Sequence, residues 1–385
     1  MKGFKNALVY VKEQGIIRCD VGVQDGKIVA IGKDLDIQSP YPYKDGHIVS
    51  AGFIDEHIHG AFGADAMDKS EKALSEISHA LIREGTTAFL ATTMTQSEEN
   101  ILSALSAIKN FILQGGTSER GGARLIGAHL EGPFISEKHI GAQPLKYLKD
   151  PDPALFLKFQ AASGNNIRLI TLAPEEPNAA ELIRTAVRSG AVVSAGHTDA
   201  GEKNMTDAIS AGLTSVTHTY NAMRPVHHRE IGTVGSAFVY DSLYTEIICD
   251  TIHVTPSAVK ILLKTKPKDK IVLITDAMRA KGLPDGESEL GGQKVFVKNG
   301  EARLSNGALA GSVLKMNVAV KNMVEICGET LENALDFATF NPARNLGLKG
   351  KGEIKEGFDA DFTVLDKNYA VKCTVVGGEV RYLAD

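Results

Sequence analysis

The sequence predicts an α/β fold, a (β/α)8 barrel of the TIM type with a small β-sandwich domain formed by both termini. Three observations lead to this prediction. The chain has 385 residues, which is enough for one large barrel with appendages. Apolar runs alternate with amphipathic helical stretches through its middle, which is typical of parallel sheets. Alternating apolar and polar residues with tight turns occupy both of its ends.

The two ends of the chain predict short antiparallel strands. Near the N-terminus these are ALVYV, IIRCDVGVQDG and KIVAIG, and Asp25-Gly26 is a strong hairpin signal. Near the C-terminus GEIKEGFDADFTVLD and KCTVVGGEVRYLAD have the same character, with Gly377-Gly378 at a turn. We therefore expect both ends to pair in one sheet domain.

That domain is expected over residues 1–52 and 347–385, and the barrel over residues 53–346. Two alternating runs around an Asn-Gly pair predict a β-hairpin inserted at about 290–306, beside the mouth of the barrel. Eight apolar runs supply the barrel strands. In chain order they are GFIDEHIH, TTAFLATT, ARLIGAHLE, IRLITLAP, AVVSAGH, LTSVTH, YTEIICD and KIVLITD.

Helical segments lie between most of these runs. Leu74, Ile77 and Leu81 recur at spacings of three and four, which places them on one face of a helix that ends at Gly85. Eight strand and helix units favour a closed barrel over an open doubly wound sheet. The sequence has no GxGxxG after the first strand and no GxxxxGK[ST], so it gives no support to nucleotide binding by such loops.

Composition narrows the class of protein further. A net charge of −5 and a pI near 6.1 argue against a nucleic-acid or membrane-surface partner. Cys19, Cys249, Cys327 and Cys373 form no CxxC pair, which favours reduced thiols in a cytoplasmic protein. We expect neither a signal peptide nor a membrane span, because no apolar run is long enough.

Six polar residues close apolar runs at one end of the predicted barrel. The chemistry of such barrels lies at the carboxyl ends of their strands. Each residue alone has an ordinary explanation, such as a buried hydrogen bond for a histidine or a helix cap for a carboxylate. Together at one rim they predict a metal site. They are His57, His59, Glu131, His197, His218 and Asp276.

The donor atoms indicate the kind of metal. Imidazole nitrogens and carboxylate oxygens suit Zn(II), Fe(II), Mn(II) or Co(II), in one or two copies per chain. The histidines of the first strand and Asp276 would hold one ion, the histidines of the fifth and sixth strands the other, and Glu131 would bridge them. Such ions lower the pKa of a bound water from about 15.7 towards 7. Asp276 would act as the general base and acid that takes its proton and passes it to a leaving group.

The motifs GFIDEHIHG, HLEGPF, SAGHTDA, THTYNAM and LITDAM, with the β-rich ends, resemble the amidohydrolase superfamily and, within it, the N-acetylglucosamine-6-phosphate deacetylases. The resemblance covers essentially the whole chain. Its most specific element is Glu131, because many relatives use a carboxylated lysine on strand 4, and NIRLITLAP has no lysine. The resemblance implies hydrolysis of N-acetylglucosamine 6-phosphate to glucosamine 6-phosphate and acetate, in amino-sugar catabolism and cell-wall sugar recycling.

The resemblance also implies which residues bind the phosphorylated amino sugar. Arg229 would reach the site of a neighbouring subunit, so a homodimer is expected. Several relatives have a histidine where this chain has Gln143; either Gln143 orients the acetyl group instead or that contact is absent. The implied contacts are Ala142, Gln143, Asn221, Ala222, Arg229, Asp250, His253, Leu309, Ala310, Gly311 and Ser312.

Other interpretations remain open at this point. A cyclic amidase such as a dihydroorotase is disfavoured by the missing lysine on strand 4, and a deaminase by the absence of a glutamate three residues after His197. A non-catalytic barrel homologue would have lost metal ligands, whereas all six remain. Of the other histidines, we expect His129 to lie deeper in the core. The histidines expected to carry no chemistry are His47, His79, His139, His227 and His228.

Overall fold

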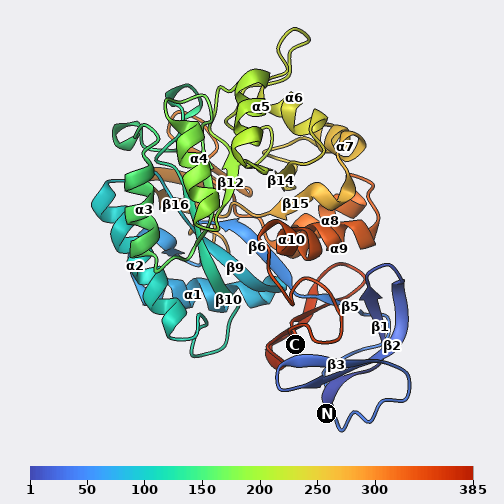
Figure 1. Cartoon of the computed structure of the whole chain (residues 1–385). Coiled ribbons are helices and arrows are strands. Elements are labelled where there is room, and N and C mark those ends of the chain that lie inside the picture. Colours follow the sequence, from blue (N-terminus) through green and yellow to red (C-terminus); the bar gives the residue numbers. More distant parts are fainter. Residues whose placement is uncertain (385) are drawn as a thin grey trace.

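The computed structural model describes residues 1–384; residue 385, the last of the expected sheet domain, lies outside the described part. The chain forms a large barrel and a smaller sheet domain (Figure 1). Both marked termini lie in the smaller domain.

Parallel strands form the barrel, and each of the predicted apolar runs contains one of them. Within residues 1–384 they pair in the order β6-β9-β10-β11-β12-β13-β14-β15. The ring closes just beyond the last strand, where the Asp276 N–H donates to the His57 carbonyl at 2.8 Å. The predicted (β/α)8 fold class is therefore confirmed. The strands are β6 (Phe53–Ile58), β9 (Thr86–Thr93), β10 (Arg124–Glu131), β11 (Ile167–Leu172), β12 (Val192–Ala195), β13 (Ser215–Val216), β14 (Tyr244–Ile248) and β15 (Ile271–Ile274).

Helices surround the barrel strands (Figure 1). The first of them buries Leu74, Ile77 and Leu81, the face that their spacing predicts. The second begins after Ser97, whose hydroxyl caps the first turn. The α-helices are α1 (Glu71–Leu81), α2 (Glu98–Leu113), α3 (Pro153–Ala162), α4 (Ala179–Arg188), α5 (Glu202–Ala211), α6 (Gly232–Val239), α7 (Pro256–Thr265), α8 (Met316–Glu325), α9 (Leu331–Ala338) and α10 (Phe340–Asn345). Short 3-10 turns are η1 (Ala66–Asp68), η2 (Ile82–Glu84), η3 (Glu137–His139), η4 (Leu145–Tyr147) and η5 (Lys268–Lys270).

One sheet joins both ends of the chain and folds over a common core as a β-sandwich. Its order is β21-β20-β19-β5-β1-β2-β3, with β4 beside β1, so a C-terminal strand pairs directly with an N-terminal one. Phe4, Val49 and Phe362 are buried in its core. Asp25 and Gly26 have φ values of 50° and 73°, as the predicted hairpin turn requires. The strands are β1 (Lys2–Val11), β2 (Gly15–Gln24), β3 (Lys27–Gly32), β4 (Ser39–Pro40), β5 (Ile48–Ala51), β19 (Phe362–Leu365), β20 (Val371–Val376) and β21 (Glu379–Leu383).

Hydrogen bonds attach this sheet to the barrel helices. The Tyr10 hydroxyl donates to Asp336 Oδ1 on α9 at 2.9 Å, and Lys12 Nζ pairs with its Oδ2 at 2.7 Å. On the other side the Thr374 hydroxyl donates to the Ile82 carbonyl at 2.7 Å. The two parts therefore share polar contacts at positions far from the mouth of the barrel.

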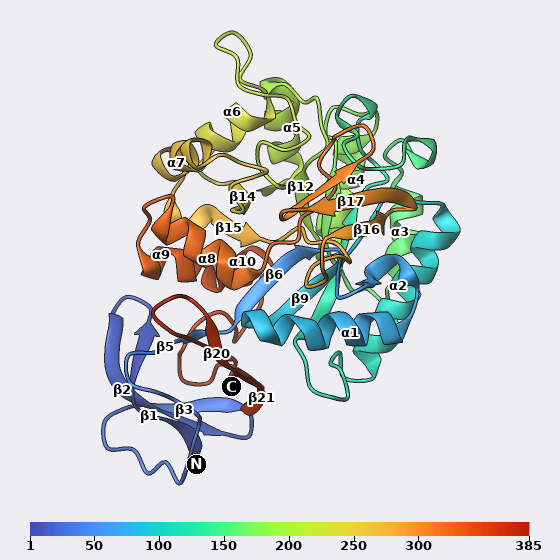
Figure 2. The same ribbon diagram turned by 180° about the vertical axis from the view of Figure 1, so that it is seen from behind.

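The segment inserted after β15 is larger than the hairpin predicted at about 290–306. It is a three-stranded antiparallel sheet within the described chain, and its first strand lies before that range. This strand was missed because its sequence, GESEL, is mostly polar and exposed. Leu290 packs with Met94 and Met278, which seats the insertion against the barrel (Figure 2). The strands are β16 (Gly286–Leu290), β17 (Gln293–Lys298) and β18 (Glu301–Leu304); a separate short pair is β7 (Gly60–Ala61) and β8 (Ala64–Asp65).

Two further features concern the chain as a whole. Over residues 1–384, no helix combines the length and apolar character needed to cross a membrane. Cys19, Cys249, Cys327 and Cys373 are buried and carry free thiols in the described structure.

Candidate metal centre

The six candidate ligands meet at the carboxyl end of the barrel. Three of them, His197, His218 and Asp276, stand just after a strand and have left-handed backbone, with φ of 47°, 30° and 48°. Residues other than glycine adopt this conformation rarely, and it is concentrated at functional sites. The sharp turn at each strand end directs the side chain across the barrel mouth instead of along the strand.

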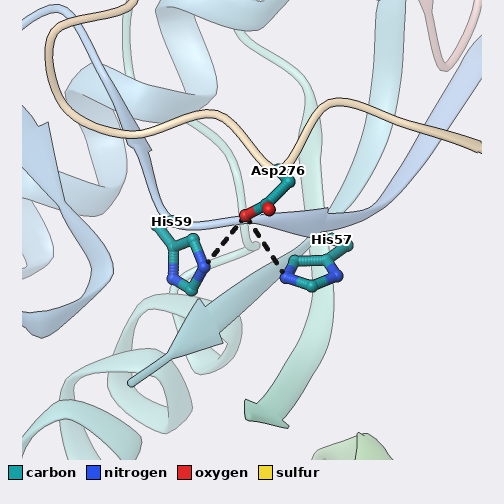
Figure 3. Close-up of side chains that lie close together, drawn as sticks. All are labelled: His57, His59 and Asp276. Atoms are coloured by element: carbon teal, nitrogen blue, oxygen red, sulfur yellow. Dashed lines mark ion pairs between the residues drawn. The ribbon is translucent and has the colours of Figure 1, made fainter. Parts of the chain in front are cut away.

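The first group of ligands is His57, His59 and Asp276 (Figure 3). The Asp276 Oδ1 atom lies 3.2 Å from His59 Nε2 and 3.5 Å from His57 Nε2. His57 and His59 share a face of β6 because side chains two apart in a strand point the same way. Asp276 reaches them because the barrel closes between β15 and β6.

The second group is Glu131, His197 and His218. Glu131 Oε1 lies 3.2 Å from Nε2 of both histidines, and these two Nε2 atoms are 3.1 Å apart. The other carboxylate oxygen, Oε2, lies 3.3 Å from Nε2 of His59 in the first group. Oε1 also lies 3.5 Å from His57 Nε2, so Glu131 stands between the two groups and contacts both.

Hydrogen bonds on the far side of the rings determine which nitrogen faces the carboxylates. His59 Nδ1 lies 3.3 Å from the Thr92 carbonyl, and His197 Nδ1 lies 3.0 Å from the His139 carbonyl. A carbonyl only accepts, so Nδ1 carries a hydrogen, and Nε2 presents a lone pair whenever the ring is neutral. His57 Nε2 is buried and has no hydrogen-bond partner in the described chain. Lone pairs aimed at carboxylate oxygens suit a cation between them, so these residues fit a divalent metal of the nitrogen- and oxygen-liganded type.

The charges of the site point to the same chemistry. Burial lowers the pKa of His57, but the charges of Asp276, Glu246 and Glu131 outweigh burial and raise this pKa to about 9. Burial raises the pKa of Glu131, yet the surrounding histidines hold it well below its ordinary value. Burial likewise lowers the pKa of His59, but the carboxylates raise it well above its ordinary value, so without a metal, protons on His57 and His59 balance the carboxylates. A divalent cation therefore competes with protons here, as at other histidine metal sites.

A cavity of about 380 Å³ opens above the ligands. Five of the six ligands line it, whereas His57 lies fully buried beneath them. Of the implied substrate contacts, those in the cavity wall are Ala142, Gln143, Asn221, Ala222, His253, Leu309 and Gly311.

The structure places four implied contacts outside the cavity wall. Asp250 stands behind His253, and its Oδ2 accepts from His253 Nδ1 at 2.6 Å. Ala310 and Ser312 are buried. Arg229 is exposed, lies between β13 and α6, and is absent from the residues that line the cavity within one chain.

Gln143 lies against a candidate ligand. Its side-chain N–H donates to Glu131 Oε2 at 2.8 Å, and its carbonyl oxygen accepts the Thr95 N–H at 2.8 Å. Both the nitrogen and the oxygen of the Gln143 amide therefore make hydrogen bonds, and the bond from its nitrogen orients the Glu131 carboxylate.

Sequence reasoning missed two residues that support the site. His139, expected to carry no chemistry, lines the cavity, and its carbonyl holds the His197 ring. Its closeness in sequence to Ala142 was the available signal. Glu246 was missed although a carboxylate inside the apolar run YTEIICD is unusual; its Oε2 lies 3.0 Å from His57 Nδ1. His129 is buried one layer deeper, as expected, with its ring centroid 4.5 Å from that of His57.

Comparisons with known proteins agree with this geometry. The sequence matches the amidohydrolase family model over residues 48–381. It is 43% identical to an N-acetylglucosamine-6-phosphate deacetylase of Lysinibacillus sphaericus, over 94% of this chain and 93% of that protein. It is 40% identical to that of Bacillus subtilis strain 168, over 99% and 97%. The crystal structure of the Thermotoga maritima N-acetylglucosamine-6-phosphate deacetylase superposes with a TM-score of 0.89 at 34% identity, covering 99% of this chain and 100% of that one.

Proposed function

The chain belongs to the amidohydrolase family, in the branch of the N-acetylglucosamine-6-phosphate deacetylases, and we propose that it hydrolyses N-acetylglucosamine 6-phosphate to glucosamine 6-phosphate and acetate. It is a metal-dependent hydrolase of amide bonds. The observation that carries the proposal is the Glu131 carboxylate, which has Oε1 towards His197 and His218 and Oε2 towards His59. Two ligand groups joined in this way suit one or two divalent cations at the floor of a cavity large enough for a sugar.

Asp276 moves the proton in the proposed reaction. When bound, a divalent cation lowers the pKa of a coordinated water from about 15.7 towards 7 and polarises the amide carbonyl. The Asp276 side chain is 11% exposed, more than that of any other candidate ligand, so water and substrate reach it. Its carboxylate accepts a proton from the attacking water and donates it to the amide nitrogen, which leaves as an amine.

We propose His253 as the side chain that contacts the substrate near the acetyl group. Its Nδ1 is held by Asp250, which leaves Nε2 as the free ring nitrogen in the cavity wall. Gln143 is the less suitable group for this role, because both ends of its amide already bind Glu131 and Thr95. The role of Gln143 is then to hold Glu131 in place.

For the phosphate we propose Asn221, the backbone of Ala222 and Arg229 of a second copy of the chain. Asn221 and Ala222 lie in the cavity wall. Arg229 has no carboxylate partner among the described residues, although its planar guanidinium is suited to phosphate. An exposed arginine that does not line its own cavity is free to enter a neighbouring subunit, so the functional unit is a homodimer.

Mixing two impaired variants, one in substrate binding and one in turnover, tests this shared site. Arg229→Ala should raise KM for the phosphorylated sugar with kcat little changed, and Asp276→Asn should lose turnover. In a mixed dimer of the two, one site has an intact Asp276 and receives an intact Arg229 from its partner. We expect co-refolded variants to recover a low KM in that site, and light scattering to show a dimer. Unchanged KM in Arg229→Ala would exclude this residue from the phosphate site.

The direct test of function is acetate release. Purified protein should release acetate from N-acetylglucosamine 6-phosphate far faster than from the unphosphorylated sugar, with metal content determined on the same sample. N-acetylgalactosamine 6-phosphate tests selection at C4, and dihydroorotate tests the cyclic amidase alternative. Turnover of dihydroorotate alone would overturn the proposal.

The metal and the cellular location follow as finer proposals. Nitrogen and oxygen donors suit Zn(II), Fe(II), Mn(II) or Co(II), and elemental analysis of protein purified without added metal would distinguish them. The four buried cysteines with free thiols support a cytoplasmic location, where thiols stay reduced.

A further inference from the structure

One carboxylate beneath the metal centre touches a ligand from each group. Glu246 lies on β14 and is 1% exposed. Its Oε2 atom is 3.0 Å from His57 Nδ1 and accepts the His218 backbone N–H at 3.1 Å. His57 belongs to the first ligand group and His218 to the second. A single oxygen atom therefore connects the two groups from below, opposite the side on which Glu131 connects them.

No cationic side chain accompanies this buried carboxylate. The ion pairs of the described chain give Glu246 only His57 as a partner, and its other oxygen, Oε1, has no hydrogen-bond partner there. Burying an uncompensated carboxylate is costly. Among its described contacts, the His57 ring is the one through which positive charge reaches it, from a proton or from a cation on the opposite nitrogen.

The two contacts fix different features of the ligands. The contact to Nδ1 of His57 holds that ring in the tautomer whose Nε2 faces Glu131 and Asp276. The contact to the backbone of His218 holds this residue at a φ of 30°, a backbone conformation that is unfavourable for residues other than glycine. Loss of Glu246 would allow the His57 ring to rotate and the backbone at His218, just after β13, to relax.

We propose that Glu246 is a positioning residue that couples the two metal sites, so that its removal weakens metal binding at both. This inference deepens the proposed function and rests on it. A residue that only oriented His57 would affect the first site alone. Loss of such supporting hydrogen bonds typically costs about 10- to 100-fold in metal affinity.

The neighbouring Glu56 provides a matched control. It is also fully buried in the barrel, and burial together with the charge of Glu246 raises its pKa well above the ordinary value. Its Oε1 accepts from Asn345 Nδ2 at 2.8 Å and touches no candidate ligand. Glu56→Gln therefore changes a buried side chain of β6, the strand of His57, without changing its size and without removing a contact to a ligand.

The experiment is a metal titration of the chelator-treated full-length protein. Wild type, Glu246→Ala, Glu246→Gln and Glu56→Gln are titrated with Zn²⁺ alone against a chromophoric chelator, and far-UV circular dichroism and Tm report folding. We expect about 10- to 100-fold weaker binding of both equivalents in Glu246→Ala. Glu246→Gln keeps an oxygen for the His218 N–H but loses the charge, so we expect a smaller loss at the second site than at the first. Glu56→Gln should bind as wild type does.

Three results would overturn the proposal: wild-type affinity in both Glu246 variants, a loss confined to one equivalent in Glu246→Ala, or an equal loss in Glu56→Gln. A wild type that binds only one ion would also overturn the coupling. The titration needs no substrate, so failure of the proposed function is separate. A chain that binds two ions and depends on Glu246, yet releases no acetate, would refute the function and retain the coupling.

Discussion

The two ligand groups differ in what anchors them. In the first group, the Nδ1 atoms of His57 and His59 bond to the Glu246 side chain on β14 and the Thr92 carbonyl on β9. Both anchors belong to barrel strands, which are buried and paired on both sides. The first group is therefore fixed by the core of the barrel.

In the second group, the His218 backbone is held by Glu246 of the barrel core, but the anchors of His197 and Glu131 lie on the segment that follows β10. The His139 carbonyl accepts from His197 Nδ1, and the Gln143 amide donates to Glu131. His139 and Gln143 also line the cavity. The first group is thus held by the core alone and the second partly by the wall of the substrate cavity, so changes in that wall should affect mainly the second group.

The largest expected effect comes from Asp276, the point at which the first group meets the cavity. Asp276→Asn keeps the shape of the side chain but cannot accept a proton, so kcat should fall by about 10²- to 10⁴-fold. Circular dichroism should show an intact fold. A near-normal kcat would remove Asp276 from its acid and base role.

Next in size is the effect of pH on the metal-free protein, which tests the electrostatics of the first group. The pKa of His57 in the folded chain is raised to about 9, above its ordinary value of 6.5. Protonated His57 therefore stabilises the metal-free fold fully below pH 6.5, and this contribution, about 3 kcal/mol, is lost as pH rises through 9. The Tm of chelator-treated protein should fall over this range relative to metal-loaded protein. A constant difference between the two forms would contradict the assignment.

The smallest of the three effects sharpens the contrast between the groups. Gln143→Ala should weaken metal binding by about tenfold in the second group, to which Glu131 belongs, and by less in the first group, which the same carboxylate reaches only through the Oε2 atom that Gln143 binds and through a longer contact to His57. Gln293→Ala is the control, since Gln293 donates to the Ala142 carbonyl at 2.6 Å and supports the same segment without touching a ligand. Competition with a chelator measures the metal affinity of both variants. An equal loss of affinity at both sites in Gln143→Ala would contradict the different anchoring of the two ligand groups.

Much of the fold could be predicted because strand periodicity is local. Each apolar run contains a barrel strand, and Asp25-Gly26 forms the expected turn. The strand β16 was missed because Leu290 is its only buried residue, and an exposed polar strand carries no apolar alternation. Arg229 could be identified as a substrate contact from the resemblance, but within one chain it does not line the cavity.

The sequence by itself determined the ligand types, since a histidine or carboxylate at the end of an apolar run follows from local pattern and the carboxyl ends of barrel strands converge. Tertiary structure alone decided how these ligands are oriented. Glu246, His139 and Gln143 act through hydrogen bonds to residues between 12 and 189 positions away, and such bonds leave no periodic trace in the sequence. Orientation of a ring depends on a partner brought near by the closed barrel, and only folding supplies that partner.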